Sequence, residues 1–259
     1  MSREFYNNYL ENFGKRASVG DWSKPYSWYL RGWLPLDLEA NILELGCGEG
    51  HLLAAFKRWG YRQVRGIDLR PVAVAFCRTR GLEAETVDAR DYLKGRTGEF
   101  QTILAIDVLE HLTREEGLDL LEGVHLALRP GGTVILQVPN LASPFGGAIF
   151  FGDITHRTGF TETSIRQVLG LAGFSQVEVR PTGPGLWSTK STIRYLLWQM
   201  VQLLVRLWNV IEFGGTGPSV LTRVLLARGR ALPEKDMTPM NKDTIATGLM
   251  VDGAPHSVL

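Results

Sequence analysis

The sequence predicts an α/β fold in which a doubly wound, mostly parallel sheet carries helices on both faces. From residue 41 onward, short runs rich in β-forming residues alternate with stretches of helical periodicity. The first run leads into a glycine-rich loop, and an acidic residue follows each of the next three runs. Because the carboxyl ends of parallel strands meet at one edge of a sheet, these observations place a ligand site at that edge.

Seven runs have strand composition, and four segments between them have helical periodicity. The strand runs are 41–46, 63–68, 84–87, 100–106, 133–139, 176–180 and 220–227, and the helical segments are 51–59, 71–80, 114–128 and 162–172. Pro71 suits the first turn of a helix, and residues 129–132 (Arg-Pro-Gly-Gly) indicate a stop and turn. Thr161 and Ser164 are suited to cap the last helix.

The remaining segments are assigned from their composition. Residues 1–40 are rich in aromatic side chains and are expected to form a helical N-terminal cap. Residues 41–185 form the ligand-binding core, 186–217 an apolar helical insertion, and 218–230 the final core strand. Residues 231–259 lose periodicity and are expected to be a disordered tail.

Composition narrows the classes of partner and compartment. The net charge of +1 gives no electrostatic footprint for nucleic acid, so no nucleic-acid partner is expected. The two cysteines, Cys47 and Cys77, lack metal-ligand spacing and suit reduced thiols in a cytoplasmic protein. The first residues contain no apolar segment typical of a signal peptide. The longest candidate span, 195–205, is far shorter than the roughly 20 residues that cross a bilayer.

The glycine loop is the strongest local signal. An apolar strand ends in Gly46, Gly48 and Gly50, and a helix is expected from His51. Glycines there permit a tight turn and close approach of the backbone to a ligand. The Gly-x-Gly-x-Gly spacing and the preceding Glu44 disfavour a pyrophosphate site, because a carboxylate would repel phosphate.

The acids after the strands suggest the chemistry of the ligand. Asp68 ends the second strand, where a doubly wound fold places the acid that binds ribose hydroxyls. Asp88 follows the third strand, where it can meet an adenine amino group, and Asp107 follows the fourth. Together with Glu44, these acids suit a ligand that has a cationic end, a ribose and an adenine.

These motifs resemble the ordered motifs of class I S-adenosylmethionine-dependent methyltransferases, of the type 11 and 23 groups. The resemblance covers roughly residues 41–180, includes residues 128–132, and returns at the final strand. It implies a seven-stranded Rossmann-like sheet with one strand reversed at its edge. The cofactor-binding residues that it implies are Glu44, Gly46, Gly48, Gly50, Asp68, Leu69, Asp88, Ala89 and Asp107. Among these, the glycines would face the methionine part, and Asp107 would lie near the sulfonium.

A second group of residues suggests a metal site. Asp107, Glu110 and His111 follow the fourth strand, and His156 lies on a later loop. This acid-x-x-Glu-His pattern with a distant histidine is similar to metal-assisted O-methyltransferases of vicinal diols, among them small-RNA 3′-end and polyprenyl-quinone methyltransferases. The resemblance implies Mg²⁺ or Mn²⁺ on these four residues. A metal-free alternative stays open, in which His111 or His156 is a general base and Asp107 is a catalytic partner.

The substrate is suggested by resemblance alone. Asp153–His156 (Asp-Ile-Thr-His), with the segments that follow, looks like bacterial methyltransferases of cell-surface polysaccharide synthesis. This implies O-methylation of a glycan or a lipid-linked sugar. Quinone or catechol O-methylation is the enzymatic alternative, and a non-catalytic methyltransferase-like binding module is the other.

Residues 190–213 form a long apolar helix candidate. Six apolar residues recur at helical spacing, namely Ile193, Leu197, Met200, Leu204, Leu207 and Ile211. Two interpretations are equally open: a core or dimerisation helix, or a helix lying on the inner face of the membrane. The expected location is therefore cytoplasmic, with peripheral membrane contact under the second interpretation.

Overall fold

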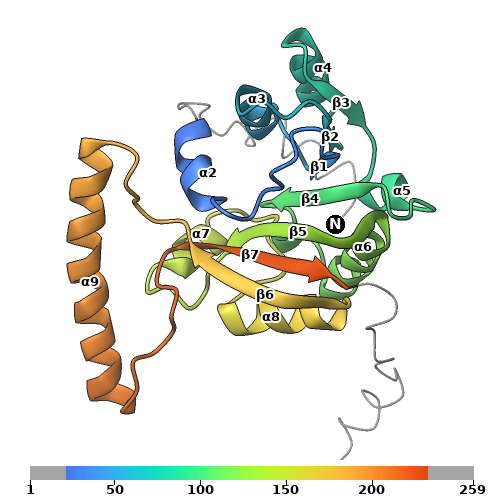
Figure 1. The fold of residues 1–259 in the computed structure, drawn as a ribbon. Helices are drawn as coiled ribbons and strands as arrows, with labels where there is room; N and C mark the ends of the chain where they lie inside the picture. The colour runs from blue at the N-terminus through green and yellow to red at the C-terminus, as the bar shows by residue number, and fades with distance from the viewer. Residues whose placement is uncertain (1–21, 233–259) are drawn as a thin grey trace, which may run out of the picture.

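A computed structural model of the chain describes residues 22–232 (Figure 1). Its core is a seven-stranded sheet with the order β3-β2-β1-β4-β5-β7-β6. The strands are β1 (Ile42–Leu45), β2 (Val64–Asp68), β3 (Glu83–Thr86), β4 (Phe100–Ile106), β5 (Leu128–Pro139), β6 (Phe174–Pro181) and β7 (Val224–Ala231). The predicted doubly wound α/β fold is confirmed.

Helices cover both faces of the sheet. The principal helices are α2 (Ser23–Tyr29), α3 (His51–Arg58), α4 (Pro71–Thr79), α6 (Arg114–Ala127), α8 (Glu162–Leu171) and α9 (Thr189–Phe213). Shorter ones are α5 (Ala89–Leu93), α7 (Gly146–Phe150) and the 3₁₀ helix η1 (Leu109–His111). Side chains of α2, α3 and α4 form one apolar cluster on the sheet, and those of α5, α6 and α8 form the other. The fold is thus a three-layer α/β sandwich.

The sheet order brings the predicted ligand-binding loops together. β1 pairs in parallel with both β2 and β4, and β4 pairs in parallel with β5. All four residues of β1 are buried, as expected for a central strand covered on both faces. The glycine loop after β1 therefore lies between the loops that follow β2 and β4.

The reversed strand is not at the edge of the sheet, as the sequence had suggested. β7 runs antiparallel to both β5 and β6, and it lies between them, so β6 is the edge strand. The final strand also begins at Val224 rather than at Val220. The reason is a contact with a distant segment: the Val220 and Thr222 carbonyls accept hydrogen bonds from the buried Asn140 side chain instead of joining the sheet ladder.

The turn expected at residues 129–132 is an irregularity within β5. Leu128 already pairs with Phe100 of β4, and regular pairing resumes at Thr133, with a register shift between the two. Gly131 has a φ of +78°, which allows the chain to bulge without leaving the sheet. The chain therefore stays in β5 through residues 129–132, because β5 pairs with β4 both before and after them.

Two terminal expectations fall largely outside the described residues. Of the N-terminal cap, the structure describes residues 22–40, including α2, but not residues 1–21. The tail assigned to 231–259 lies outside the described residues from position 233 onward. None of the helices in residues 22–232 combines the length and apolarity needed to cross a membrane.

Candidate active site

The glycine loop after β1 adopts a conformation that side chains would obstruct. Gly46, Gly48 and Gly50 have φ values of +68°, +53° and +73°. A Cβ atom on Gly46 would lie 2.6 Å from Cγ2 of Val108, and one on Gly50 would lie 2.7 Å from Cδ1 of Leu82. Glycine is therefore needed both for the left-handed backbone and for close packing against the loop that follows β4.

Asp68 connects the ends of β1 and β2. Its Oδ2 accepts a hydrogen bond from the Gly48 backbone N–H at 2.8 Å. Its Oδ1 accepts from the backbone N–H of Arg70 at 2.9 Å and from Nε of Arg70 at 3.2 Å. The carboxylate is thus held against the glycine loop, where an acid expected to bind ribose belongs, and Leu69 follows it directly.

Glu44 and Asp88 occupy different environments. The Glu44 side chain is 3% exposed, and its burial, with the nearby Cys77 and Asp68, raises the pKa of its carboxyl well above the usual value. Asp88 lies at the N-terminus of α5, where its Oδ1 accepts from the backbone N–H of Arg90 at 2.9 Å, directly before Ala89.

Asp107 is fixed by a chain of side-chain hydrogen bonds to the cap helix α2. Its φ of +54° is unusual for a residue other than glycine. Its Oδ1 accepts from Nε2 of Gln137 at 3.1 Å, and Oε1 of Gln137 accepts from the Tyr26 hydroxyl at 2.9 Å. Burial, followed by the charges of Asp107 and Glu44, raises the pKa of Tyr26 well above its usual value.

Part of the aromatic N-terminal segment lies over the glycine loop. The Trp22 ring stacks on His51, the first residue of α3, with ring centroids 5.2 Å apart. The Tyr26 ring of α2 stacks on the ring of Trp22, the residue before this helix, with centroids 5.5 Å apart. The sequence indicated an aromatic N-terminal cap but not these contacts. It also gave no signal for Gln137, whose side chain joins Asp107 to Tyr26.

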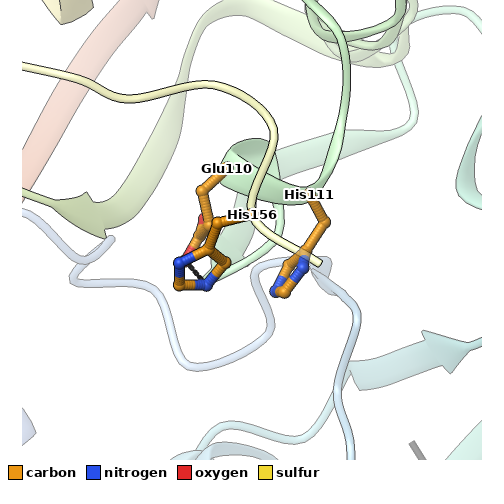
Figure 2. Close-up of side chains that lie close together, drawn as sticks. All are labelled: Glu110, His111 and His156. Carbon is orange, nitrogen blue, oxygen red and sulfur yellow. Dashed lines mark ion pairs between the residues drawn. The ribbon is translucent and has the colours of Figure 1, made fainter. Parts of the chain in front are cut away.

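Three of the four proposed metal ligands come together beyond the end of β4. Glu110, His111 and His156 offer ligand atoms that all lie within 4.8 Å of one another. Figure 2 shows the three side chains side by side, the first two from η1 and His156 from a separate loop. Nε2 of His156 lies 4.0 Å from Oε1 of Glu110. Asp107 is not brought into this cluster of the described residues, since its Oδ1 is bound to Gln137.

Hydrogen bonds to the other ring nitrogens orient both imidazoles. Nδ1 of His156 lies 2.8 Å from the Phe150 carbonyl, so this nitrogen carries the proton. Nδ1 of His111 lies 2.8 Å from Oγ1 of Thr155, whose own hydroxyl donates to Oδ1 of Asp153 at 2.6 Å. Since Thr155 has one proton to donate, Nδ1 of His111 is the donor. Both Nε2 atoms therefore keep their lone pairs.

This donor set fits a divalent cation. Two imidazole nitrogens and a buried carboxylate are suitable ligands, and protein ligands typically have their second nitrogen hydrogen-bonded in this way. The backbone N–H groups of Arg157 and Thr158 donate to the Glu110 carbonyl at 2.7 and 3.1 Å, which holds the two contributing segments together. The contact of Thr155 with His111 was not predicted from the sequence, although the Asp-x-Thr spacing of Asp153 and Thr155 is typical of a local side-chain turn.

The sheet order and its flanking helices are those of the class I S-adenosylmethionine-dependent methyltransferase fold. A known structure of such an enzyme, from Archaeoglobus fulgidus, superimposes with a TM-score of 0.58 at 20% identity and covers 88% of this chain and 94% of its own. The model of the methyltransferase domain family matches residues 21–179. The chain therefore belongs to this family.

Curated relatives match only the central part of the chain. The trans-aconitate 2-methyltransferase of Mycobacterium tuberculosis is 29% identical over 116 residues, which are 44% of this chain and 43% of that protein. The ubiquinone biosynthesis O-methyltransferase of Thiobacillus denitrificans is 30% identical over 106 residues, 39% of this chain and 44% of that protein. This chain thus spans less than half the length of these relatives.

Proposed function

We propose that this methyltransferase transfers the methyl group to a hydroxyl of a vicinal diol on a glycan or lipid-linked sugar, assisted by a divalent cation. The observation that carries the proposal is the cluster of Glu110, His111 and His156, in which both imidazoles have Nδ1 hydrogen-bonded to a neighbouring oxygen. The cluster follows β4 at the sheet edge that also carries the glycine loop. Two adjacent substrate oxygens would occupy two of the positions left open on a metal held by three protein ligands.

The residues of the chain would divide the work between binding and alignment. S-adenosylmethionine supplies a methyl group already activated by the sulfonium charge, so the protein needs chiefly to align the acceptor oxygen and remove its proton. The glycine loop, Glu44, Asp68, Leu69, Asp88 and Ala89 would bind the cofactor, and Asp107 would lie near its sulfonium.

Glu110, His111 and His156 would hold Mg²⁺ or Mn²⁺, which lowers the pKa of a coordinated hydroxyl. Of the two cations, two imidazole ligands favour Mn²⁺. In the metal-free alternative, Nε2 of His111 or His156 takes the proton directly.

Quinone or catechol O-methylation is the second candidate, because it uses the same diol chemistry. The observation that favours it is the similarity to the ubiquinone biosynthesis O-methyltransferase. A non-catalytic binding module would have no need for the well-ordered glycine loop and the Asp68 contacts. Both cysteines are free and buried, which agrees with the cytoplasmic location that we propose.

The test is transfer of labelled methyl from S-adenosylmethionine to an extract of the source cells, separated into polysaccharide, lipid, small-molecule and protein fractions. We expect label in a glycan or lipid-linked sugar, abolished by EDTA and restored by Mn²⁺. The variant His156→Ala should lose this activity, whereas His125→Ala, a histidine of α6 against Phe174, should retain it.

Each other result has a distinct meaning. Label in a quinone-containing lipid would replace the sugar with the second candidate. Labelling that is insensitive to EDTA in the wild type but lost in His156→Ala would replace the metal with a histidine base. If S-adenosylmethionine binds but no fraction is labelled, the binding-module alternative gains; if it does not bind, the cofactor assignments are wrong.

A further inference from the structure

Helix α9 turns its more polar face toward the rest of the molecule. Apart from Thr192 in the first turn, its buried and half-buried residues recur at three- and four-residue spacing, and they are Ser191, Tyr195, Trp198, Gln202, Val205 and Asn209. Oγ of Ser191 accepts a hydrogen bond from the Gly185 N–H at 3.3 Å. Nε1 of Trp198 lies against Gly183, and the Asn209 side chain lies against Gly217. These contacts fix which side of the helix faces inward.

The opposite face of α9 is apolar and exposed. Nine side chains on it are between 53% and 77% exposed, namely Ile193, Leu196, Leu197, Met200, Leu203, Leu204, Leu207, Trp208 and Ile211. At 3.6 residues per turn they span an arc of roughly 140°. Helices of soluble proteins normally show the reverse arrangement, with the apolar face inward. Such a surface requires a covering partner, and within residues 22–232 no other element supplies one.

The width and charge of this face favour a lipid surface over a second helix. A two-helix seam uses a narrower stripe than this arc, whereas the interfacial layer of a membrane contacts the whole of it. Along the flanks of the helix, Lys190, Arg194 and Arg206 outnumber the single acid, Glu212. In the described part of the chain, these three cations are exposed and none forms an ion pair, although the charge of Arg194 acts on the Tyr29 hydroxyl; their side chains are long enough to reach lipid phosphates.

The helix emerges at the sheet edge that carries the candidate site. β6 and β5 are both antiparallel to β7, so β6 runs in the same direction as β5 and ends at that edge. In Figure 1 the arrowheads of β4, β5 and β6 point toward the side where α9 stands. The Tyr29 hydroxyl of α2 donates to the carbonyls of Thr182 and Gly183 at 2.9 and 3.0 Å, which fastens the segment before α9 to the cap.

We propose that α9 lies in the headgroup layer of a negatively charged membrane and holds the strand-end site beside the lipid surface. The apolar arc enters the acyl boundary, and Arg194 and Arg206 contact phosphates on either side of it. A lipid-linked sugar then reaches the site from the membrane rather than from bulk water. This choice of acceptor rests on the proposed function, whereas the docking of α9 does not.

The experiment is flotation of the full chain with vesicles of phosphatidylcholine alone and with one part in four of phosphatidylglycerol. We expect binding that is stronger on the anionic vesicles and weakened by salt. Leu204→Glu should lower partitioning to the vesicles about tenfold, because it removes one apolar side chain that would enter the membrane and adds a negative charge that anionic lipid repels. Leu126→Glu on α6 is the matched control, since Leu126 is 62% and Leu204 66% exposed.

Three further measurements make the outcome decisive. The double variant Arg194→Gln, Arg206→Gln should lose the preference for anionic vesicles while retaining binding to neutral ones. Binding of S-adenosylmethionine, measured by calorimetry, should be unchanged in every variant. A variant that no longer binds it is misfolded, and a wild type that does not bind it contradicts the proposed function; neither result bears on the docking of α9. Sedimentation equilibrium measures self-association: a dimer that Leu204→Glu dissociates, without vesicle binding, would make a second copy the occupant. A wild-type monomer that does not float would also overturn the proposal.

Discussion

Thr155→Val is the sharpest test of the proposed metal site, because it removes one hydroxyl behind the proposed ligands and leaves all three of them in place. Oγ1 of Thr155 accepts a hydrogen bond from Nδ1 of His111 at 2.8 Å. Thr155 is only 1% exposed, so bulk water cannot take the place of its hydroxyl. Leaving a buried donor unpaired costs about 1–3 kcal/mol. Moving the proton to Nε2 would avoid that cost but would remove the lone pair that we propose as a metal ligand. We therefore expect Mn²⁺ affinity to fall about 10- to 100-fold.

The assay is titration of Mn²⁺ into the full chain, followed by the electron paramagnetic resonance signal of the free ion. Thr155→Ser, which keeps the hydroxyl, should bind within about threefold of the wild type. Thr102→Val is the control for loss of a buried threonine hydroxyl, since Thr102 contacts Thr133 at 3.3 Å within the sheet. Equal Mn²⁺ affinity in Thr155→Val and the wild type would refute the assigned role, and no measurable binding to the wild type would refute the site.

Three further predictions concern stability, each measured by urea unfolding. Gly46→Ala should lower the free energy of unfolding by about 3 kcal/mol and abolish S-adenosylmethionine binding. Gly131 is equally left-handed, but a Cβ there would have no atom within 4 Å, so Gly131→Ala should lower the free energy of unfolding by only about 1 kcal/mol. Equal losses in the two variants would refute the close-packing argument. Because burial raises the pKa of Glu44, its neutral form stabilises at low pH and this contribution is lost as pH rises, so Glu44→Gln should gain stability relative to the wild type from pH 5 to pH 8. A constant difference would contradict this. Thr113→Ala removes the cap of α6, where its hydroxyl accepts from the Glu116 N–H at 3.1 Å, and should cost about 1 kcal/mol.

The parallel half of the sheet was predictable from sequence because each signal there is local. The runs that became β1, β2 and β4 lie within a few residues of their predicted bounds, and Pro71 begins α4 as expected. The antiparallel half depends on contacts between distant segments. Nothing near Val220 shows that Asn140 binds its carbonyl and delays the strand to Val224. A short apolar run has the same composition whether it pairs in a sheet or packs as a loop.

The candidate site shows the same division. The resemblance to metal-assisted methyltransferases singled out Glu110, His111 and His156, and the structure brings these three side chains together, while their role as metal ligands stays a prediction. The hydrogen-bond partners of the two histidines could not be predicted from sequence. Every residue has a backbone carbonyl like that of Phe150, and Thr155 reaches His111 only because the fold brings the two segments together. Asp107 was grouped with the metal ligands because the acid-x-x-Glu-His pattern resembles that of metal-assisted methyltransferases. Its left-handed backbone and its bond to Gln137 place its carboxylate with the cap helix instead.

Helix α9 illustrates what periodicity cannot specify. The six residues from Ile193 to Ile211 do share one face, as their spacing predicts, but spacing does not determine whether that face meets protein or solvent. Both faces of the sheet are already covered, by α2, α3 and α4 on one side and α5, α6 and α8 on the other. The described core thus leaves α9 no apolar surface to cover, and its polar face has the contacts to the body. Periodicity thus predicts that these residues share a face of α9, whereas the contacts of Ser191, Trp198 and Asn209 determine that this face is turned away from the body.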